Sequence, residues 1–528
     1  MTVTAPAAHV PVGSDAQLRC VDPATGELLG EVKTHTPAEV RAIVETARRA
    51  QASWAASPFA LRKRLLSGML ERLLARTDEV VDAIVRDAGK TRENAILGEL
   101  WPVAEKIRWT LAEGEAALRD EPVPSGLFVH KRARIEYDPR GVIGIIAPWN
   151  YPLQNILGPA VPALYAGNAV VVKVSEHVAW SAERFRPIWE ETLRELGLPP
   201  GLLQLVHGDG RAGEALIQSD VELIVFTGSM GNGKKVLRTS AETLTPTILE
   251  LGGKDAMIVC EDAKLEAAAH AALAGSFIAA GQNCLAAERT LVHAKVYDAF
   301  VARVRELAGS LRLGVPHRAP GEVDVGALVT PQQREIVKAL VDDAVAKGAE
   351  VLVGGDLDGT PRGGNFFPPT VLAGCTPDMA IMQEETFGPV MAICKVHDDD
   401  EAVRVANGTA YGLGLTVFTA DAERGRRLSR RIQTGSASVN DFGFTYMVQG
   451  LPFGGLKGSG FGRLNGRAGL RACTQQKAVL EDRVSLGIPA KLYPVGRGDY
   501  GRTRGVLRTL YGRSVGQRLR GLRELLGG

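Results

Sequence analysis

The stretch LIVFTGSMGNGKK, residues 223–235, passes from a short apolar run through a glycine-rich segment into a helix-like sequence. This order is typical of a strand–turn–helix unit in a parallel α/β sheet. Glycines in such a turn let the backbone approach a phosphate, and the N-terminus of the following helix stabilises its negative charge. An ordinary strand-to-helix turn without a ligand is the alternative interpretation. The stretch predicts an α/β fold and a candidate phosphate site.

The same stretch matches most of a nucleoside-triphosphate signature. Gly228, Gly233 and Lys234 fit the G-x-x-x-x-G-K of that motif. Its last position must be Ser or Thr, because the hydroxyl binds magnesium. Here that position is Lys235. A P-loop NTPase is therefore disfavoured, and a dinucleotide fits the segment better.

Short runs rich in Val and Ile alternate with helix-length segments on both sides of residue 250. Such runs, bounded by Gly and Pro, indicate parallel strands in βαβ units. Residues 38–118, which precede them, have the three- and four-residue apolar spacing of helices. The pattern predicts two α/β domains joined near residue 250. The expected strands lie within 141–148, 168–174, 202–208, 223–228, 255–261, 289–296, 349–355, 390–396 and 413–420.

Composition disfavours several classes of protein. A chain of 528 residues is long enough for two or three domains, and a net charge of +2 gives no signal for nucleic acid. The six cysteines contain no C-x-x-C pair, so neither a disulfide framework nor a zinc site is expected. The N-terminus has no signal-peptide pattern, and no apolar run approaches the roughly 18 residues of a membrane span. We expect a cytoplasmic protein that binds no metal and no nucleic acid.

Two further segments favour a dinucleotide. GDGRAG, which begins at Gly208, fits the G-x-G-x-x-G pattern after an expected strand, although the acid expected about 20 residues later is missing. KVSE places Lys173 and Glu176 at the end of another expected strand, where ligand-binding groups gather in such sheets. The pair could hold a ribose by its hydroxyls. A carboxylate at Glu176 would repel a 2′-phosphate, so NAD is favoured over NADP.

Three polar residues occupy positions suited to catalysis, although each has a plainer explanation. Cys284 follows a long helical run, Glu250 ends an apolar run before a glycine pair, and Asn150 lies between two prolines in APWNYP. A lone cysteine is commonly a buried apolar residue. A Glu before Gly-Gly is commonly a solvated turn residue, and an Asn between prolines commonly marks a turn. Taken singly, these residues do not decide the function.

Six motifs that occur in order identify a family. From about residue 20 to 485 the chain resembles the NAD(P)-dependent aldehyde dehydrogenase superfamily, and its flanking phrases are similar to a plant branch known as family 22. The resemblance implies an aldehyde dehydrogenase-like α/β fold, with two Rossmann-like parallel-sheet domains and a small oligomerisation arm. The motifs are PWNYP (148–152), FTGS (226–229), LELGGK (249–254), GQNC (281–284), EETFGP (384–389) and PFGGLKGSGFGR (452–463).

The resemblance also divides the chain. It implies an NAD-binding domain, a catalytic domain and an arm through which subunits assemble into a homodimer or homotetramer. The NAD-binding domain is expected at 20–128 and 146–250, the catalytic domain at 251–452, and the arm at 129–145 and 468–485.

By the same resemblance, the reaction is the NAD-dependent oxidation of an aldehyde to a carboxylic acid. Cys284 attacks the aldehyde, Asn150 stabilises the oxyanion, and Glu250 activates the water that hydrolyses a thioester. A coenzyme A-acylating dehydrogenase, which Glu250 disfavours, and a non-catalytic protein on the same fold are the alternatives. The residues expected to bind the cofactor are Lys173, Glu176, Gly208, Gly228, Ser229, Gly233, Glu385 and Phe387.

The residues expected to line the substrate tunnel are a mixed apolar and polar set. No cationic clamp for a dicarboxylic semialdehyde is evident among them, so we expect a hydrophobic aldehyde of medium length. They are Tyr151, Gln154, Asn283, Leu285, Phe442 and Phe453.

Residues 486–528 differ from the rest of the chain. They hold nine Lys or Arg and two acids, a net charge of +7. Apolar residues from Leu507 to Leu526 fall on one face of a single expected helix, with arginines around it. One interpretation is contact with an anionic membrane surface. The other is packing on the enzyme itself or on a neighbouring subunit.

Overall fold

The computed structural model of the protein describes residues 12–13, 17–485 and 493–527. These residues belong to two compact units. The larger contains residues up to 120 and residues 136–477, and the smaller contains residues 121–135 and 478 onward. Both large sheets, and the candidate site between them, lie within the larger unit.

The first large sheet is parallel except for one short strand at its edge. Its order is β18-β10-β9-β6-β7-β8. The chain runs outward from β6 through β7 to β8, and then returns to the other side of β6 for β9 and β10. The reversal creates a topological switch point between β6 and β9, where α/β sheets bind ligands at the carboxyl ends of their strands. The strands are β6 (Val142–Ile146), β7 (Ala169–Lys173), β8 (Leu203–Val206), β9 (Leu223–Gly228), β10 (Thr247–Leu251) and the antiparallel β18 (Gly460–Phe461).

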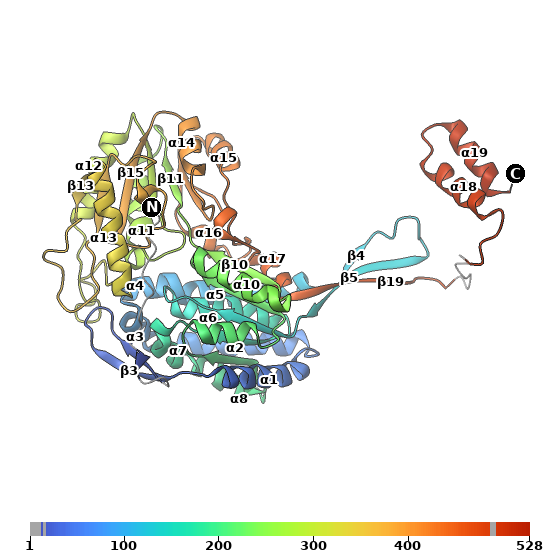
Figure 1. Ribbon diagram of the computed structural model, residues 1–528, viewed down its shortest axis with the longest axis horizontal. Helices are drawn as coiled ribbons and strands as arrows, with labels where there is room; N and C mark the ends of the chain where they lie inside the picture. The colour runs from blue at the N-terminus through green and yellow to red at the C-terminus, as the bar shows by residue number, and fades with distance from the viewer. Residues whose placement is uncertain (1–11, 14–16, 486–492, 528) are drawn as a thin grey trace. The chain divides into compact units, whose positions relative to one another are not determined.

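Helices from the first half of the chain pack around this sheet (Figure 1). The first begins with a capping box, in which the Thr36 hydroxyl accepts from the Glu39 amide and the Thr36 amide donates to the Glu39 carboxylate. Its last residue, Trp54, donates from the indole to the Leu164 carbonyl at 2.8 Å and ties α1 to α6. The helices are α1 (Pro37–Trp54), α2 (Phe59–Ala75), α3 (Thr77–Ala88), α4 (Arg92–Ala95), α5 (Trp101–Leu118), α6 (Pro152–Tyr165), α7 (Ala179–Phe185), α8 (Pro187–Glu195), α9 (Gly210–Ile217) and α10 (Met230–Thr243).

The second large sheet has the order β13-β14-β15-β12-β11-β16-β17 and is parallel apart from β13. Its apolar side chains form one continuous core with the surrounding helices. In the view of Figure 1, α12 and α13 flank it on one side and α14 and α15 on the other. The strands are β11 (Ala256–Val259), β12 (Arg289–His293), β13 (Glu350–Val353), β14 (Thr370–Ala373), β15 (Val390–Val396), β16 (Leu415–Phe418) and β17 (Ser438–Val439). The helices are α11 (Leu265–Phe277), α12 (Tyr297–Gly309), α13 (Pro331–Ala346), α14 (Asp399–Asn407), α15 (Ala422–Arg431), α16 (Phe444–Met447) and α17 (Gly466–Ala472).

The two large sheets meet end to end. β10 finishes at Leu251 and β11 begins at Ala256, so the carboxyl edge of the first sheet leads directly into the amino edge of the second. The loops that enter β12 and β15 are therefore close to this junction. One carries Cys284 and the other carries Glu385 and Phe387. This arrangement confirms the predicted pair of parallel sheets joined near residue 250, and each of the nine expected strand regions contains a strand.

Two small sheets involve the remaining described strands. One has the order β1-β2-β3 and the other β19-β5-β4. β5 and β19 fall in the two segments expected to form the oligomerisation arm. Within the smaller unit, Arg134 and Glu481 join them by an ion pair of 2.9 Å. The strands are β1 (Val12–Gly13), β2 (Gln17–Val21), β3 (Leu28–Lys33), β4 (Glu121–Val123), β5 (Lys131–Pro139) and β19 (Thr474–Asp482).

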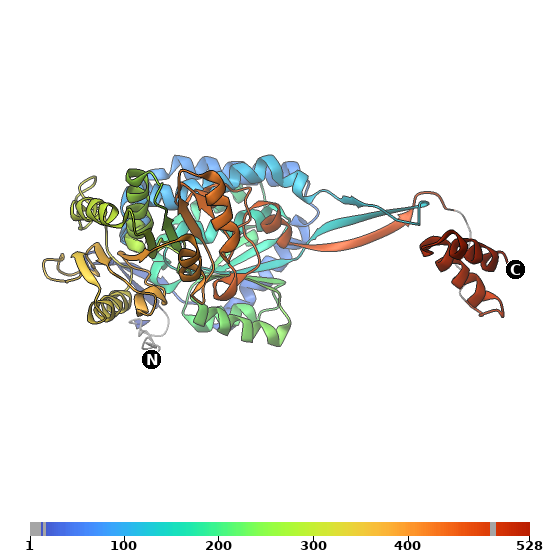
Figure 2. The same ribbon diagram turned by 90° about the horizontal axis from the view of Figure 1, so that it is seen from above.

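The described part of the C-terminal tail is a hairpin of two helices, α18 (Asp499–Tyr511) and α19 (Val515–Leu525). Figure 2 shows the two helices packed against each other. The prediction of a single helix is wrong because Gly512 ends α18 and Ser514 starts α19 with a capping box. Backbones meet closely at Gly505, whose Cβ would lie 2.6 Å from the Gly521 carbonyl oxygen. Residues 486–492, expected to belong to this tail, lie outside the described residues.

Candidate active site

A cavity of about 390 Å³ lies where the two large sheets meet, and all three predicted catalytic residues line it. Asn150 follows β6, Glu250 lies in β10, and Cys284 belongs to the loop before β12. The structure thus brings together three side chains from distant parts of the chain. All six residues expected in the tunnel also line this cavity: Tyr151, Gln154, Asn283, Leu285, Phe442 and Phe453.

The loop that presents Cys284 begins with an unusual left-handed turn. Ala279 and Ala280 have φ values of 51° and 54°, and Gly281 follows at 72°. Two consecutive non-glycine residues in this region are a costly arrangement that persists only where the surroundings enforce it. At Gly281 only a glycine fits, because a Cβ would lie 2.0 Å from the Gly388 carbonyl oxygen. No pattern in the sequence indicated this turn.

Gln282 anchors the same loop from inside the protein. Its side-chain amide donates to the Ala279 carbonyl at 3.0 Å and its Oε1 accepts from the Val329 amide at 2.9 Å. The Gln282 carbonyl accepts from Asn150 Nδ2 at 3.1 Å. The loop and the Asn150 carboxamide are therefore held in one network, which orients that amide beside Cys284.

Burial in the cavity raises the pKa of both reactive groups. Burial raises the pKa of Glu250 to about 7, a shift that the side chains of Cys284 and Thr227 partly oppose. Burial also raises the pKa of the Cys284 thiol well above its ordinary value, and the neighbouring Glu250 charge adds to that rise. Glu250 Oε1 is buried without a hydrogen-bond partner in the described protein. A carboxylate with this pKa and a vacant acceptor is suited to take a proton from the thiol or from a water near neutral pH.

A buried ion pair, which was not recognised from the sequence, supports Asn150 from behind. Lys90 Nζ donates to the Asn150 carbonyl at 2.6 Å and to Glu99 at 2.8 Å. Glu99, at the end of the π-helical turn η1 (Ile96–Leu100), also accepts from the Leu153 amide at 2.7 Å, at the start of α6. Both charged side chains are almost fully buried. The pair fixes the backbone that carries Asn150.

The predicted cofactor residues on the first sheet occupy the carboxyl ends of its strands. At the end of β7, Lys173 forms a largely buried ion pair of 2.9 Å with Glu176. Burial alone would raise the pKa of Glu176, but the Lys173 charge and the hydrogen bonds to this carboxylate bring the pKa below its ordinary value. Gly208 lies between β8 and α9, and Gly228 ends β9. This clustering follows the rule for ligand sites in such sheets.

The loop after β9 is shorter than expected from the sequence, because part of the glycine-rich segment is helical. α10 begins at Met230 rather than near Lys234, so Gly233 lies in its first turn. The reason is Ser229, which caps the helix by accepting from the Asn232 amide at 3.3 Å. The free amides of this first turn are suited to bind an anion.

The second group of predicted cofactor residues, Glu385 and Phe387, precedes β15. Glu288 accepts from the Thr386 and Phe387 amides at 2.8 Å each and pairs with buried Lys254 at 2.6 Å. Phe387 is held at φ 48°, with its ring 5.4 Å from the Trp149 ring. Glu288 and Lys254 were not singled out in the sequence, although Lys254 ends the LELGGK motif and Glu288 follows the GQNC motif by four residues.

Glu385 is a half-buried carboxyl group at the sheet junction. It accepts from the Gly253 amide at 3.1 Å, and burial raises its pKa to about 8. Ribose hydroxyls can donate to such a carboxyl group and to Glu176. Together with the free amides of α10 and the fixed Phe387 ring, these donors and acceptors fit a nicotinamide dinucleotide.

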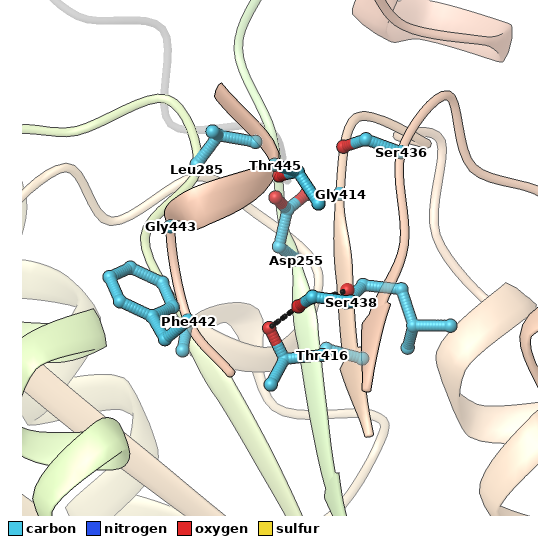
Figure 3. Close-up of a pocket in the computed structure, with 12 residues that line it drawn as sticks. Asp255, Leu285, Gly414, Thr416, Ser436, Ser438, Phe442, Gly443 and Thr445 are labelled. Atoms are coloured by element: carbon cyan, nitrogen blue, oxygen red, sulfur yellow. Dashed lines mark hydrogen bonds between the residues drawn. The ribbon is translucent and has the colours of Figure 1, made fainter. Parts of the chain in front are cut away.

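A small second pocket lies behind the catalytic loop and has a wall of hydroxyl groups (Figure 3). It shares Leu285, Phe442 and Gly443 with the large cavity. Asp255 lies in it, and burial raises the pKa of this carboxyl to about 8. The Thr416 and Ser438 hydroxyls are 3.1 Å apart and complete the polar wall. With a volume of about 20 Å³, this pocket has room for a water molecule and none for a substrate.

Comparison with known families identifies the family of this chain. The model of the Aldehyde dehydrogenase family matches residues 10–479 of the chain. The chain belongs to this family. The aldehyde dehydrogenase fold predicted from the motifs is thereby confirmed, and the protein is an aldehyde-oxidising enzyme. Its similarity to the plant branch stays a prediction.

Three relatives illustrate the range of the enzyme's similarity. An aldehyde dehydrogenase-like protein of Schizosaccharomyces pombe is 37% identical, over 94% of this chain and 96% of its own. The 4,4'-diapolycopene aldehyde oxidase of a Methylomonas species is 35% identical, over 94% of this chain and 91% of its own. The crystal structure of a Mycobacterium tuberculosis aldehyde dehydrogenase complexed with NAD+ superposes with a TM-score of 0.83 at 31% identity, covering 90% of this chain and 96% of that one.

Proposed function

We propose that this aldehyde dehydrogenase uses NAD to oxidise an apolar aldehyde to a carboxylic acid through a thioester on Cys284. The observation that carries the proposal is the convergence of a thiol, a carboxyl group and a carboxamide on one cavity. Each group has the chemistry that one step of the reaction requires.

In the first step the Cys284 sulfur attacks the aldehyde carbon. The thiol proton passes to Glu250, because the raised pKa of that carboxyl lets it hold a proton near neutral pH. The resulting oxyanion accepts hydrogen bonds from Asn150 Nδ2 and from the Cys284 amide. A donor of this kind typically lowers the barrier by about 3 kcal/mol.

In the later steps the thiohemiacetal becomes a thioester, which water then hydrolyses. A bound nicotinamide dinucleotide would supply the acceptor for the hydride from the former aldehyde carbon. Glu250 first releases the thiol proton to solvent and then takes a proton from water. Hydroxide attacks the thioester carbonyl, the Cys284 thiolate leaves, and it recovers a proton from Glu250 as the carboxylic acid departs. The vacant Glu250 Oε1 favours hydrolysis over transfer of the acyl group to coenzyme A.

The proposed cofactor contacts follow the two clusters of residues. Lys173 and Glu176 bind one ribose, and Glu176 disfavours the 2′-phosphate of NADP by its charge. Ser229 and the first turn of α10 bind the pyrophosphate, with Gly208, Gly228 and Gly233 at the strand ends beside it. Glu385 binds the second ribose, and Phe387 lies against the nicotinamide.

The proposed assembly rests on the remaining segments. Within the ranges 129–145 and 468–485, β5 and β19 form the arm of a homodimer or homotetramer, because β19 is an edge strand whose side chains are mostly exposed. The α18–α19 hairpin makes peripheral contact with an anionic membrane, since arginines surround large apolar side chains that it leaves exposed. Within the described residues, no helix has the length and apolar character needed to cross a bilayer.

NADH absorbance tests the proposed function most simply. Wild-type protein is mixed with NAD or NADP and a series of straight-chain aldehydes, beside Cys284→Ala and the control Cys375→Ala. Cys375 is buried in the second sheet's core and lies outside the cavity. We expect NAD-dependent turnover in the wild type and the control, and none in Cys284→Ala. Equal turnover in Cys284→Ala would overturn the thioester route.

A further inference from the structure

The large cavity has one cationic side chain in its wall, Lys106 on α5, and one acid, Glu250, among the described residues that line it. Lys106 is only 4% exposed. Among the described residues, no carboxylate lies within 4 Å of its ammonium group, and Asn465 Oδ1 is the acceptor it contacts. Burial of an ammonium group without an opposite charge costs free energy. A lysine in such a position at a cavity wall therefore indicates either a ligand that supplies the missing charge or a structural role.

The acceptor that Lys106 does have is held by a strained backbone. Asn465 has φ 57° and ψ 161°, a region essentially restricted to glycine. Its carbonyl accepts from the Gly469 amide at 2.9 Å, and the next amide, Gly466, donates to Gln449 at 2.8 Å. Strain of this kind clusters at ligand-binding positions, where it sets the direction of a side chain. Here it directs Asn465 Oδ1 to the ammonium and leaves other ammonium hydrogens for a further acceptor.

The wall around Lys106 is otherwise uncharged. Its ammonium lies 5.9 Å from the centre of the Tyr446 ring, and the Tyr446 hydroxyl is already engaged by Gln154 Nε2. The nearby lining residues on the same helix are Trp101 and Pro102. The cavity therefore combines a reactive thiol, a largely apolar wall and a single ammonium group.

We propose that Lys106 binds a carboxylate at the far end of the substrate, so that the preferred aldehyde is an apolar chain carrying an acid group at its other end. This inference rests on the proposed function, because it takes Cys284 as the group that receives the aldehyde. The product is then a dicarboxylic acid. The structure thereby supplies the cationic group that was not evident among the tunnel residues expected from the sequence.

Binding of a substrate carboxylate to Lys106 should depend on pH. Burial lowers the pKa of Lys106 to about 7. The titratable groups that face Lys106 are Tyr446 and Cys473. Burial raises the pKa of the Tyr446 hydroxyl well above its ordinary value and that of the Cys473 thiol to about 12. Arg140, beside Cys473, stays charged. Of these groups, Lys106 is therefore the one that loses its charge as pH rises through about 7. Selectivity for an acid-ended aldehyde should fall over the same pH range, because the neutral amine no longer attracts a carboxylate.

The test compares two aldehydes of equal chain length, one ending in a carboxylate and one in a methyl group. The ratio of their kcat/KM values is measured for wild type, for Lys106→Met and for the control Lys63→Met, whose ammonium pairs with Glu115 near the surface. We expect wild type and the control to prefer the acid by at least about tenfold, and Lys106→Met to lose that preference through KM.

The pH dependence gives a second readout. Glu250 also titrates near pH 7, and its negative charge in the same cavity disfavours the acid-ended aldehyde, so the contribution of Lys106 is the difference between the wild-type and Lys106→Met pH profiles of the ratio. We expect the wild-type ratio to fall as pH rises through about 7. A ratio near one at every pH, or a preference that Lys106→Met retains, would overturn the proposal. Absence of NADH from both aldehydes would instead refute the proposed function itself.

Discussion

At the scale of single residues, the chemistry depends on how burial sets the protonation of Glu250. Its pKa is raised to about 7, and the group must be ionised to act as a base. With a saturating straight-chain aldehyde, kcat should therefore rise with pH through about 7 and level off above it. Glu250→Gln should remove this limb and lower kcat by about a hundredfold or more. A pH profile that is the same in both proteins would exclude Glu250 as the base.

The Lys90–Glu99 pair is a second residue-scale feature with a measurable consequence. Replacing Lys90 by Met leaves a buried carboxylate without its partner, which typically costs about 3–5 kcal/mol. We expect that loss in the free energy of unfolding from urea titration, together with lower activity, since Asn150 loses its support.

The matched control for this pair is exposed. Lys33 and Glu39 also form an ion pair of 2.8 Å, but both side chains are largely in solvent. Lys33→Met should change the unfolding free energy by less than about 1 kcal/mol. Equal effects of the two substitutions would show that the buried pair has no special role.

At the scale of elements, the left-handed turn before Cys284 is the feature most sensitive to one added methyl group. Gly281→Ala combines a disfavoured φ with a clash against the Gly388 carbonyl, so we expect a loss of more than about 3 kcal/mol and of activity. Gly309→Ala, at the end of α12, meets no atom within 4 Å and serves as control. It should leave stability unchanged or slightly raised. Thermal unfolding of both variants decides whether the turn is required.

Helices and strands can be predicted from the sequence where apolar residues keep one regular spacing, or one continuous run, along the whole element. The Val- and Ile-rich runs are strands because both faces of the sheets are buried. β10 was not predicted as a strand because its run ends in Glu250, and β18 because it has only two residues. Asn150, Glu250 and Cys284 were recognisable from motifs. Lys106, the Lys90–Glu99 pair and the left-handed turn were not, because they depend on long-range burial and backbone conformation.

At the scale of the whole molecule, the C-terminal hairpin is separable from the chemistry in our proposal. A chain ending at residue 485 keeps every residue that lines the cavity. It should oxidise aldehydes with the same kcat as the full chain, but it should not float with liposomes that contain anionic lipid. The full chain should float, and should detach at high salt because arginines supply the attraction. Flotation of both proteins, or of neither, would contradict a membrane role for the hairpin.

The most direct test of the thioester mechanism is a single turnover of Glu250→Gln with NAD and a straight-chain aldehyde. The variant also lacks the base that takes the thiol proton, so acyl formation should be slower than in the wild type. If Cys284 carries the acyl group and Glu250 activates the water, NADH should still rise to about one equivalent per active site and then stop. Intact-mass spectrometry should then find the protein heavier by one acyl group on Cys284. A variant that turns over at the wild-type rate, or NADH formation without any acyl adduct, would contradict this mechanism.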